Sequence, residues 1–209
     1  GVVATVDLTG LDLMPFDGGM PVPRPYAIVE HGGRLWVALN NLNPVTYSPE
    51  GPGLLAVIDP VTLDAGTVEL GSAGCLNPVA IAPYEGKLYV SCAGAAIYDM
   101  NFALIGTDRA GVVAYDPVTG ARASWVPQCP AGGDGGCLPV LPSRLAVRDG
   151  RVYLGDQNGG RIFVADLLMD GGFAERRGYA AGSLSGPVQA CGVDPMVGFS
   201  NVADILVLP

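Results

Sequence analysis

The sequence contains one histidine, and its eleven lysine and arginine residues are outnumbered by twenty aspartate and glutamate residues. A catalytic triad or a histidine-based metal site would therefore have to use His31, which lies in an expected turn, Glu30–Gly33. The net charge of −9 disfavours nucleic acids and anionic membrane surfaces as partners, because phosphate binding requires clustered basic side chains.

Long apolar runs and paired cysteine motifs are also missing. No run approaches the roughly 18 apolar residues of a membrane-spanning helix, and no basic, apolar signal segment stands at Gly1. We therefore expect any signal segment to have been removed or to lie outside this chain. No Cys-x-x-Cys pair is present, which excludes the usual zinc and c-type haem motifs.

The residues that are abundant point to a β protein. Charged residues make up 15% of the chain and apolar residues 49%, a balance typical of a packed protein rather than a disordered one. The 31 glycines and 18 prolines have no collagen period, so they indicate frequent turns.

The stretch Asn77–Cys92 (NPVAIAPYEGKLYVSC) predicts a β-hairpin, because two short apolar runs flank a turn at Tyr84-Glu85-Gly86. Three other stretches match it, each with a proline near the entry to its first strand. These stretches are Arg24–Leu39, Leu141–Gly155 and Asp194–Pro209.

A second repeated element is an apolar strand that ends in aspartate. Asp-Pro-Val-Thr follows this strand at 59–62 and at 116–119, a signature in which the aspartate accepts local backbone hydrogen bonds. We expect these aspartates to cap turns rather than to bind a metal around a channel. The four copies are Gly1–Asp7, Gly53–Asp59, Gly111–Asp116 and Arg161–Asp166.

The two elements alternate along the chain, which is the pattern of a β-propeller with four-stranded antiparallel blades. We predict an all-β fold with about four blades' worth of strands, either as a single domain over residues 1–209 or as part of a larger propeller. Helices should be few, because no stretch has a sustained helical period; one helical turn is expected in Ala93–Leu104. The expected hairpins span residues 1–20, 24–39, 53–72, 77–92, 111–126, 141–155, 161–180 and 194–209.

The repeat resembles the YVTN/NHL-like β-propeller family of secreted and surface proteins. The matching residues are 77–80 (NPVA), 86–90 (GKLYV) and 53–60 (GLLAVIDP). The resemblance covers nearly the whole chain, but only as a repeat type. The sequence departs from the family's pattern in its long insertions and in its last hairpin, where Ser200–Ala203 replaces the usual glycine turn. It implies a propeller fold that hosts binding modules, scaffolds, lactonases and lyases, so fold does not decide activity.

Unpaired strands at the two ends of the chain would expose backbone donors and acceptors, so something must cover them. Three arrangements satisfy this condition. The ends pair in a closed four-bladed ring, two copies form an eight-bladed ring, or the chain is one part of a longer protein. Propellers of this repeat type usually have more than four blades, which favours the last two arrangements.

The five cysteines predict two disulfides. Cys129 and Cys137 bracket a glycine-rich loop, and Cys75 and Cys92 flank the hairpin at 77–92, which leaves Cys191 over. Two bridges indicate an oxidising, extracytoplasmic compartment: the periplasm, the cell surface or the medium. The alternative is a set of buried, reduced thiols.

Long connections should gather at one end of the propeller, and we call this end the long-loop face. They are Asn40–Pro52, Cys92–Ala110, Pro127–Val140 and Gly182–Val193, whereas the turns at the other end are short. Binding residues concentrate on long loops, although such insertions also pack against neighbouring chains. The candidate contact residues are Asn40, Asn41, Asn43, Tyr47, Tyr98, Asp99, Asn101, Asp156, Gln157, Asn158 and Arg161.

Two further sites are suggested by polar residues. The positions that enter the first strand of each blade should ring the mouth of the channel. No cofactor is expected, but two stretches, 99–101 and 156–158, have the oxygen-rich chemistry that calcium prefers. The channel-mouth candidates are Arg24, Asn77, Arg144 and Asp194.

We therefore expect a non-catalytic, extracytoplasmic β-propeller that binds a protein or cell-surface partner through the long-loop face. One alternative is a lactonase- or lyase-type enzyme with its site at the channel mouth, where Asp194 is the one acidic candidate. The other is a structural subunit that pairs through open blade edges with blades of another chain or copy.

The disulfide prediction can be tested by counting thiols. Two bridges leave Cys191 alone, so denatured protein that has never met a reductant should react with no more than one equivalent of a thiol reagent. Five reactive thiols would refute both bridges and the compartment inferred from them.

Overall fold

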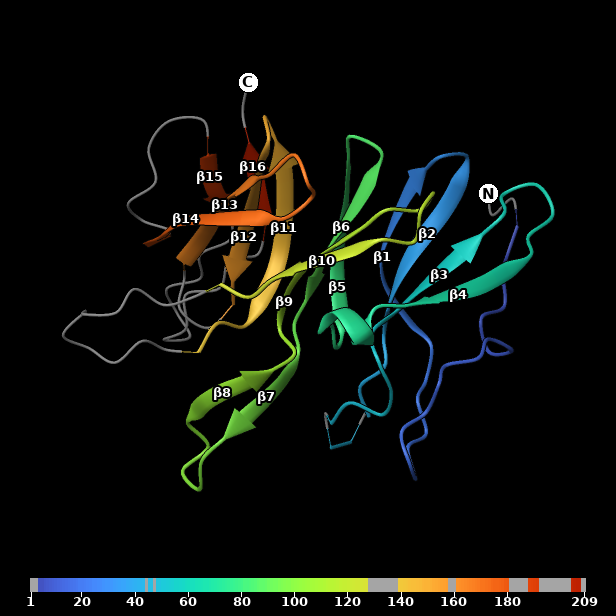
Figure 1. The fold of residues 1–209 in the computed structure, drawn as a ribbon. Helices are drawn as coiled ribbons and strands as arrows, with labels where there is room; N and C mark the ends of the chain where they lie inside the picture. The colour runs from blue at the N-terminus through green and yellow to red at the C-terminus, as the bar shows by residue number, and fades with distance from the viewer. Residues whose placement is uncertain are drawn as a thin grey trace.

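The structure, a computed structural model, describes residues 4–43, 45–46, 48–127, 139–157, 161–180, 188–191 and 204–207. Within these ranges the chain forms three four-stranded antiparallel sheets and two two-stranded hairpins (Figure 1). The helical part of these ranges is one 3₁₀ turn, η1 (Gly71–Ala73), and none of their helices is long and apolar enough to cross a membrane. The predicted all-β fold with four-stranded blades is confirmed.

Each sheet is one blade whose strands follow chain order, and strands occupy the expected ranges from 24–39 to 161–180. Blade 1 consists of β1 (Arg24–His31), β2 (Arg34–Asn40), β3 (Leu54–Ile58) and β4 (Ala65–Glu69). Blade 2 consists of β5 (Pro78–Tyr84), β6 (Lys87–Cys92), β9 (Gly111–Tyr115) and β10 (Arg122–Trp125). Blade 3 consists of β11 (Pro142–Arg148), β12 (Arg151–Asp156), β13 (Arg161–Leu167) and β14 (Phe173–Ala180).

The blades stand in a row around a common axis. Their first strands lie side by side, β1 against β5 and β5 against β11, and at the far end of the row β11 lies against β16 (Asp204–Val207). This arrangement is a partial β-propeller (Figure 1).

The core lies between the blades because each strand sends alternate side chains to opposite faces of its sheet. Leu88 and Val90 of β6 belong to the cluster shared with blade 1, which includes Trp36, whereas Tyr89 faces blade 3. Trp36 meets Tyr115 edge to face, with ring centroids 5.8 Å apart. Strand β6 therefore contributes side chains to both interfaces of blade 2.

The interface between blades 2 and 3 is built in the same way. Tyr89 and Trp125 of blade 2 pack against Leu154 and Phe163 of blade 3. Phe173 of blade 3 stacks on Trp125 with ring centroids 6.0 Å apart. Aromatic side chains therefore fill both interfaces between the described blades.

The short turns also join neighbouring blades. His31 Nε2 lies 3.2 Å from Gly86 O in the next blade's turn, and Gly150 N donates to Tyr84 Oη at 2.9 Å. His31 is therefore the last residue of β1, directly before the turn at residues 32–33, and it contacts blade 2.

The repeated aspartates cap turns, as predicted. Asp59 Oδ1 accepts hydrogen bonds from Val61 N (2.8 Å) and Thr62 N (3.1 Å), and these two bonds hold the pKa of Asp59 below its ordinary value. Asp116 accepts the corresponding bonds in blade 2. The fourth copy differs because Asp166 forms an ion pair with Arg151 at 3.2 Å.

The hairpin predicted near residues 1–20 is wrong for residues 4–20, which contain no strand. Asp7 Oδ1 accepts a hydrogen bond from Thr9 N at 2.9 Å and turns the chain. Val6, Leu8 and Leu11 then pack sideways on the face of blade 1 that points away from blade 2. Residues 4–7 have the same apolar pattern as the end of 53–59, but they lie across the face of blade 1 and do not pair as a strand of a sheet.

The helical turn expected in Ala93–Leu104 is also wrong. This region forms a hairpin of β7 (Ala95–Tyr98) and β8 (Leu104–Asp108), joined at Asp99. Asp99 Oδ1 accepts hydrogen bonds from Asn101 N and Ala103 N, both at 2.8 Å, and this reverses the chain. An aspartate turn favours a hairpin over a helix.

Of the last predicted hairpin, 194–209, the structure describes β16 (Asp204–Val207), which pairs with β15 (Val188–Cys191), a strand that precedes Asp194. Residues 192–203 lie outside the described part of the chain.

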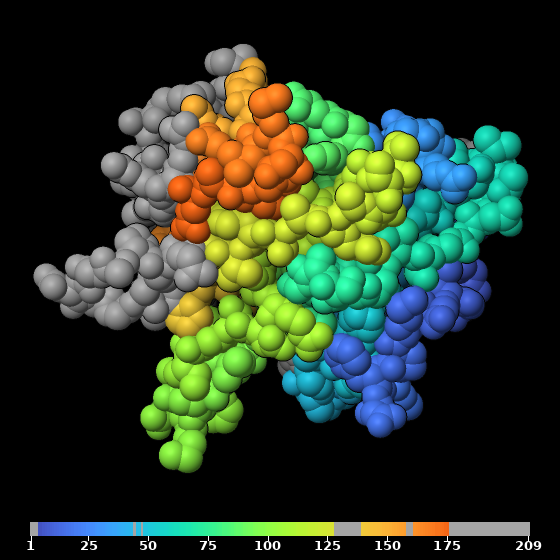
Figure 2. Space-filling view, viewed as in Figure 1, coloured from blue at the N-terminus to red at the C-terminus, as the bar shows by residue number. Residues whose placement is uncertain are grey.

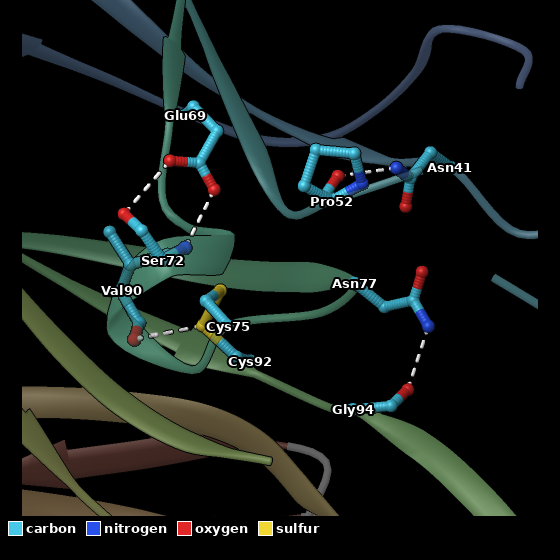
Figure 3. Close-up of a disulfide and its surroundings, with 9 residues drawn as sticks. All are labelled: Asn41, Pro52, Glu69, Ser72, Cys75, Asn77, Val90, Cys92 and Gly94. Carbon is cyan, nitrogen blue, oxygen red and sulfur yellow. Dashed lines mark hydrogen bonds between the residues drawn. A yellow bond between two sulfur atoms is a disulfide. The ribbon is translucent and has the colours of Figure 1, made fainter. Parts of the chain in front are cut away.

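Cys75 and Cys92 form a disulfide, as predicted, and both are fully buried (Figure 3). The bridge joins the segment that follows η1 to the end of β6. A Cβ on Gly53 would lie 2.7 Å from Cys75 O and 2.9 Å from Cys75 Sγ, so this close approach requires glycine. Cys129 and Cys137 lie outside the described residues.

Replacing Cys75 and Cys92 by alanine should lower the free energy of unfolding by about 3 kcal/mol, because a bridge across 17 residues restricts the unfolded chain. Urea unfolding followed by tryptophan fluorescence measures the loss. The single variant Cys75→Ala also breaks the bridge and should lose a similar amount. A double variant as stable as the oxidised protein would contradict a stabilising role for the bridge.

Candidate functional site

The described connections that leave β2 and β6, the second strands of blades 1 and 2, emerge at one end of the propeller, the lower edge in Figure 1. The short turns after the first and third strands lie at the other end or along the rim. This is the predicted long-loop face. Its main described parts are the connection 41–53, except residues 44 and 47, and the connection 93–110.

Two of the predicted contact residues in the first connection are buried. Asn40 Oδ1 accepts a hydrogen bond from Leu42 N at 3.1 Å, and Asn41 Nδ2 donates to Pro52 O. Asn40 and Asn41 are 9% and 1% exposed. Their side chains therefore stabilise the connection and are not accessible to a binding partner.

Asn43 organises the outer part of the same connection. Its Oδ1 accepts hydrogen bonds from Val45 N (2.8 Å) and Thr46 N (3.0 Å), and its Nδ2 donates to Glu50 Oε1 at 2.8 Å. Met20 N donates to the other oxygen of Glu50 at 2.9 Å. The bond from Met20, followed by that from Asn43, holds the pKa of Glu50 below its ordinary value. The carboxylate thus ties this connection to the segment before blade 1.

Asn41 and Asn77 each carry a buried amide oxygen without a hydrogen-bond partner. Asn77 Nδ2 donates to Gly94 O at 2.7 Å, and because a backbone carbonyl only accepts, this bond fixes which amide atom is the oxygen. The same argument applies to Asn41 and Pro52. In Figure 3 the two oxygens point toward one another. A buried amide oxygen of this kind needs a donor, such as an ordered water, to satisfy it.

The hairpin β7–β8, which we call the arm (residues 95–108), projects from the long-loop face (Figures 1 and 2). Two residues predicted as contacts have different roles in it. Tyr98 is 56% exposed, whereas Asp99 forms the turn at the tip. The exposed apolar side chains of the arm are Ile97 (46%), Tyr98 (56%), Met100 (97%), Phe102 (88%) and Ile105 (59%). Asn101, also predicted, is exposed beside them.

Backbone hydrogen bonds fix the base of the arm. Leu76 N donates to Arg109 O at 3.0 Å, Gly94 N donates to Leu76 O at 2.9 Å, and Ala93 N donates to Asn77 O at 2.9 Å. Leu76 directly follows the disulfide-bonded Cys75. The arm therefore starts from one of the most constrained points of the fold.

Asp156 and Arg161 form an ion pair in blade 3. Arg161 Nη2 lies 2.6 Å from Asp156 Oδ2, and Leu141 N donates to Asp156 Oδ1 at 3.0 Å. Asp156 is fully buried and Arg161 lies over the Phe163 ring, 5.3 Å from its centroid. These two predicted contact residues join the start of β11 to the hairpin of β12 and β13, while Gln157 is exposed between them.

The predicted channel-mouth residues differ in accessibility. Asn77 is fully buried, Arg24 is partly buried, and Arg144 is exposed. Asn77 therefore supports the backbone at the entry to blade 2, and Arg24 and Arg144 are the described side chains with access to solvent there.

Three predicted site residues, Tyr47, Asn158 and Asp194, lie outside the described residues. In the part that is described, no group of three or more histidine, cysteine, aspartate or glutamate side chains is placed to hold a metal ion. The calcium stretches use their carboxylates otherwise: Asp99 in its turn and Asp156 in its ion pair.

Sequence reasoning missed the apolar residues of the arm. It selected Tyr98, Asp99 and Asn101 for their polar groups and passed over Met100 and Phe102. The available signal was their position, because apolar residues in an insertion between the second and third strands of one blade lie outside the core on either side of that blade.

The sheets and their arrangement define the chain as a partial β-propeller. No model of a known protein family matches it, and no curated protein sequence does. Among solved structures it is similar to a putative 6-phosphogluconolactonase from Bacteroides fragilis NCTC 9343, at 16% identity and a TM-score of 0.42, over 71% of this chain and 36% of that one. A putative 6-phosphogluconolactonase from Bacteroides uniformis ATCC 8492 gives 12% identity and a TM-score of 0.35, over 77% of this chain and 58% of that one. The chain thus spans less than two thirds of the length of either protein, and the YVTN/NHL-like character of its repeat stays a prediction.

Asn77 has a backbone φ of 49°, a left-handed conformation that asparagine and glycine tolerate better than alanine. Asn77→Ala should therefore be less stable than Asn77→Gly by about 1 kcal/mol, although both variants lose the bond to Gly94. Urea unfolding of the two variants gives this difference. A glycine variant no more stable than the alanine variant would show that backbone conformation does not explain why asparagine stands at position 77.

Proposed function

We propose that this chain is an extracytoplasmic recognition module that binds a protein or cell-surface partner through its long-loop face, with the arm as the principal contact. The observation that carries the proposal is the exposed apolar tip of the arm. Met100 and Phe102 are 97% and 88% exposed on a hairpin that stands clear of the blades (Figure 2). Exposed apolar side chains on a projecting element are typical of interaction sites.

The chemistry of the tip suits a protein contact. Aromatic residues and methionine are enriched at protein interfaces, because they bury much area and methionine adapts its shape to its partner. Tyr98 adds a hydroxyl at the edge of the apolar group. The expected partner therefore offers an apolar groove with a polar rim.

The base of the arm supports this role. The Cys75–Cys92 bridge and the bonds of Leu76 restrain both ends of the arm, and Thr107 Oγ1 donates to Val140 O at 3.2 Å near the start of blade 3. Because a restrained element loses less conformational freedom on binding, the anchored arm favours affinity. The buried disulfide also supports the extracytoplasmic assignment, since such bridges persist in oxidising compartments.

The enzymatic alternative has weaker support. Its site would lie at the channel mouth, where the solvent-accessible candidates described are Arg24 and Arg144. Arginine side chains attract anions, but arginine does not act as a general base at neutral pH.

Photocrosslinking in the cells that produce the protein tests the proposal. A photoreactive phenylalanine analogue at Met100 should yield one discrete cross-linked species, which mass spectrometry identifies as a different protein. Met169 is the matched control, because it is a fully exposed methionine in the turn between β13 and β14, away from the long-loop face.

The Met169 position should give no such species. Cross-linking at both positions, at neither, or only between copies of this chain would overturn the assignment of the arm as the contact.

A further inference from the structure

The arm is a sheet of only two strands, so each of its strands has an outer edge. Beside its turn, Asp99 N donates inward to Ala103 O at 2.9 Å. Because the direction of bonding alternates along an antiparallel strand, Ala96 and Tyr98 direct their N–H and C=O groups away from β8. In the described part of the chain, no hydrogen bond reaches these groups from another element. The outer edge of β7 therefore presents backbone donors and acceptors that this part of the fold does not use.

The outer edges of the blades differ from this edge in their chemistry. Charged residues on an edge strand discourage pairing with another chain. The outer strands of the three blades each contain at least one: Glu69 in β4, Arg122 in β10 and Glu175 in β14. Strand β7 has the sequence AAIY, without a charged residue or a proline. Its edge therefore lacks the protection that the edges of the blades have.

The other strand of the arm is a poorer edge for pairing. The register of β7 with β8 skips Ile105, which forms a bulge in β8, and a bulge bends the strand that contains it. Thr107 Oγ1 donates to Val140 O at 3.2 Å, so β8 lies beside the start of blade 3. Strand β7 has no bulge, and its residues 96–98 are exposed. The edge of β7 is thus the regular and accessible one.

We propose that the arm binds its partner by strand addition, in which an extended segment of the partner pairs with the outer edge of β7 as a third strand. This inference rests on the proposed function and specifies how the arm recognises its partner. Ala96 and Tyr98 together offer two N–H donors and two C=O acceptors to the added strand. Main-chain bonds of this kind supply affinity in strand addition, and neighbouring side chains supply specificity.

The side chains along the edge define the chemistry of the added segment. Ile97, which is 46% exposed, lies on one face of the arm, and Ala96 and Tyr98 lie on the other. Side chains on the same face of two paired strands contact one another. Met100 and Phe102 extend the apolar surface at the tip. The segment that fits is therefore uncharged and extended, with β-branched or aromatic residues.

A phage-displayed library of short linear peptides tests the edge without the natural partner. Panning on the purified 209-residue chain should enrich peptides with apolar residues of this kind. Ala96→Pro removes an outward N–H but no bond to β8, because proline is tolerated where the N–H of an edge strand faces solvent. It should weaken binding of the enriched peptides roughly five- to tenfold, the effect of one lost hydrogen bond. Ala96→Val is the matched control, since it keeps the N–H, and should bind as the parent chain does.

Hydrogen exchange shows whether the arm stays folded in the proline variant. The Asp99 N–H, which donates to Ala103 O, should remain protected. If it does not, Ala96→Lys takes the place of Ala96→Pro. Lysine keeps the N–H but adds a charge to the edge, so it should also weaken binding of the enriched peptides.

Cross-linking from Met100 in the producing cells separates this inference from the proposed function. The cross-linked species should persist with Ala96→Val and fall with Ala96→Pro. An unchanged yield with Ala96→Pro would overturn strand addition and leave the arm as the contact. Absence of the species in the parent chain would refute the proposed function instead, and peptide binding would still decide whether the edge pairs.

Two further results would overturn the inference. The first is a library that yields no binding peptide, or peptides whose binding neither Ala96→Pro nor Ala96→Lys weakens. The second is a dimer in sedimentation velocity that Ala96→Pro dissociates, because the edge of β7 would then pair with a second copy of this chain and not with a different protein.

Discussion

The fold depends on one constraint: each blade is a sheet with two apolar faces, so it needs a neighbour on both sides. Fully burying a side chain such as valine or leucine contributes about 1.5–3 kcal/mol, and several such residues from each blade meet at each interface. Blade 2 satisfies the constraint completely, between Trp36 on one side and Phe173 on the other. The segment before blade 1 and the hairpin of β15 and β16 lie where further blades would stand, and so the two ends of the row differ from its middle.

This constraint also explains which parts of the fold could be predicted. Hairpins with alternating apolar residues and an Asp-Pro-Val-Thr turn carry their pattern locally, so 53–72 and 111–126 were recognisable from sequence. The segment Gly1–Asp7 has the same local pattern, but a strand forms only where a neighbour pairs with it, and residues 4–7 instead pass across the face of blade 1. Pairing of β16 with β15 likewise depends on tertiary contacts that a repeat alignment does not contain.

The candidate site shows a similar division. Repeat spacing located the long-loop face, because it depends only on the order of strands and loops. It did not reveal which polar side chains form bonds within the fold. Asn41 and Asn77 donate hydrogen bonds to backbone carbonyl groups, and Asp156 is paired with Arg161. Burial is a property of the folded chain, and asparagine in a loop looks the same in a sequence whether it faces a partner or the backbone. The arm was missed for the opposite reason, since its apolar residues resembled core residues.

The arm enters and leaves blade 2 at almost the same point, where Gly94 lies against Asp108 and Ala110. Its removal would therefore leave two chain ends close enough to be joined by a short turn, with β6 and β9 still paired as neighbours. Residues 95–108 can therefore change in length and chemistry without disturbing the blades. A chosen peptide grafted between Gly94 and Arg109 would therefore be displayed on a disulfide-anchored support.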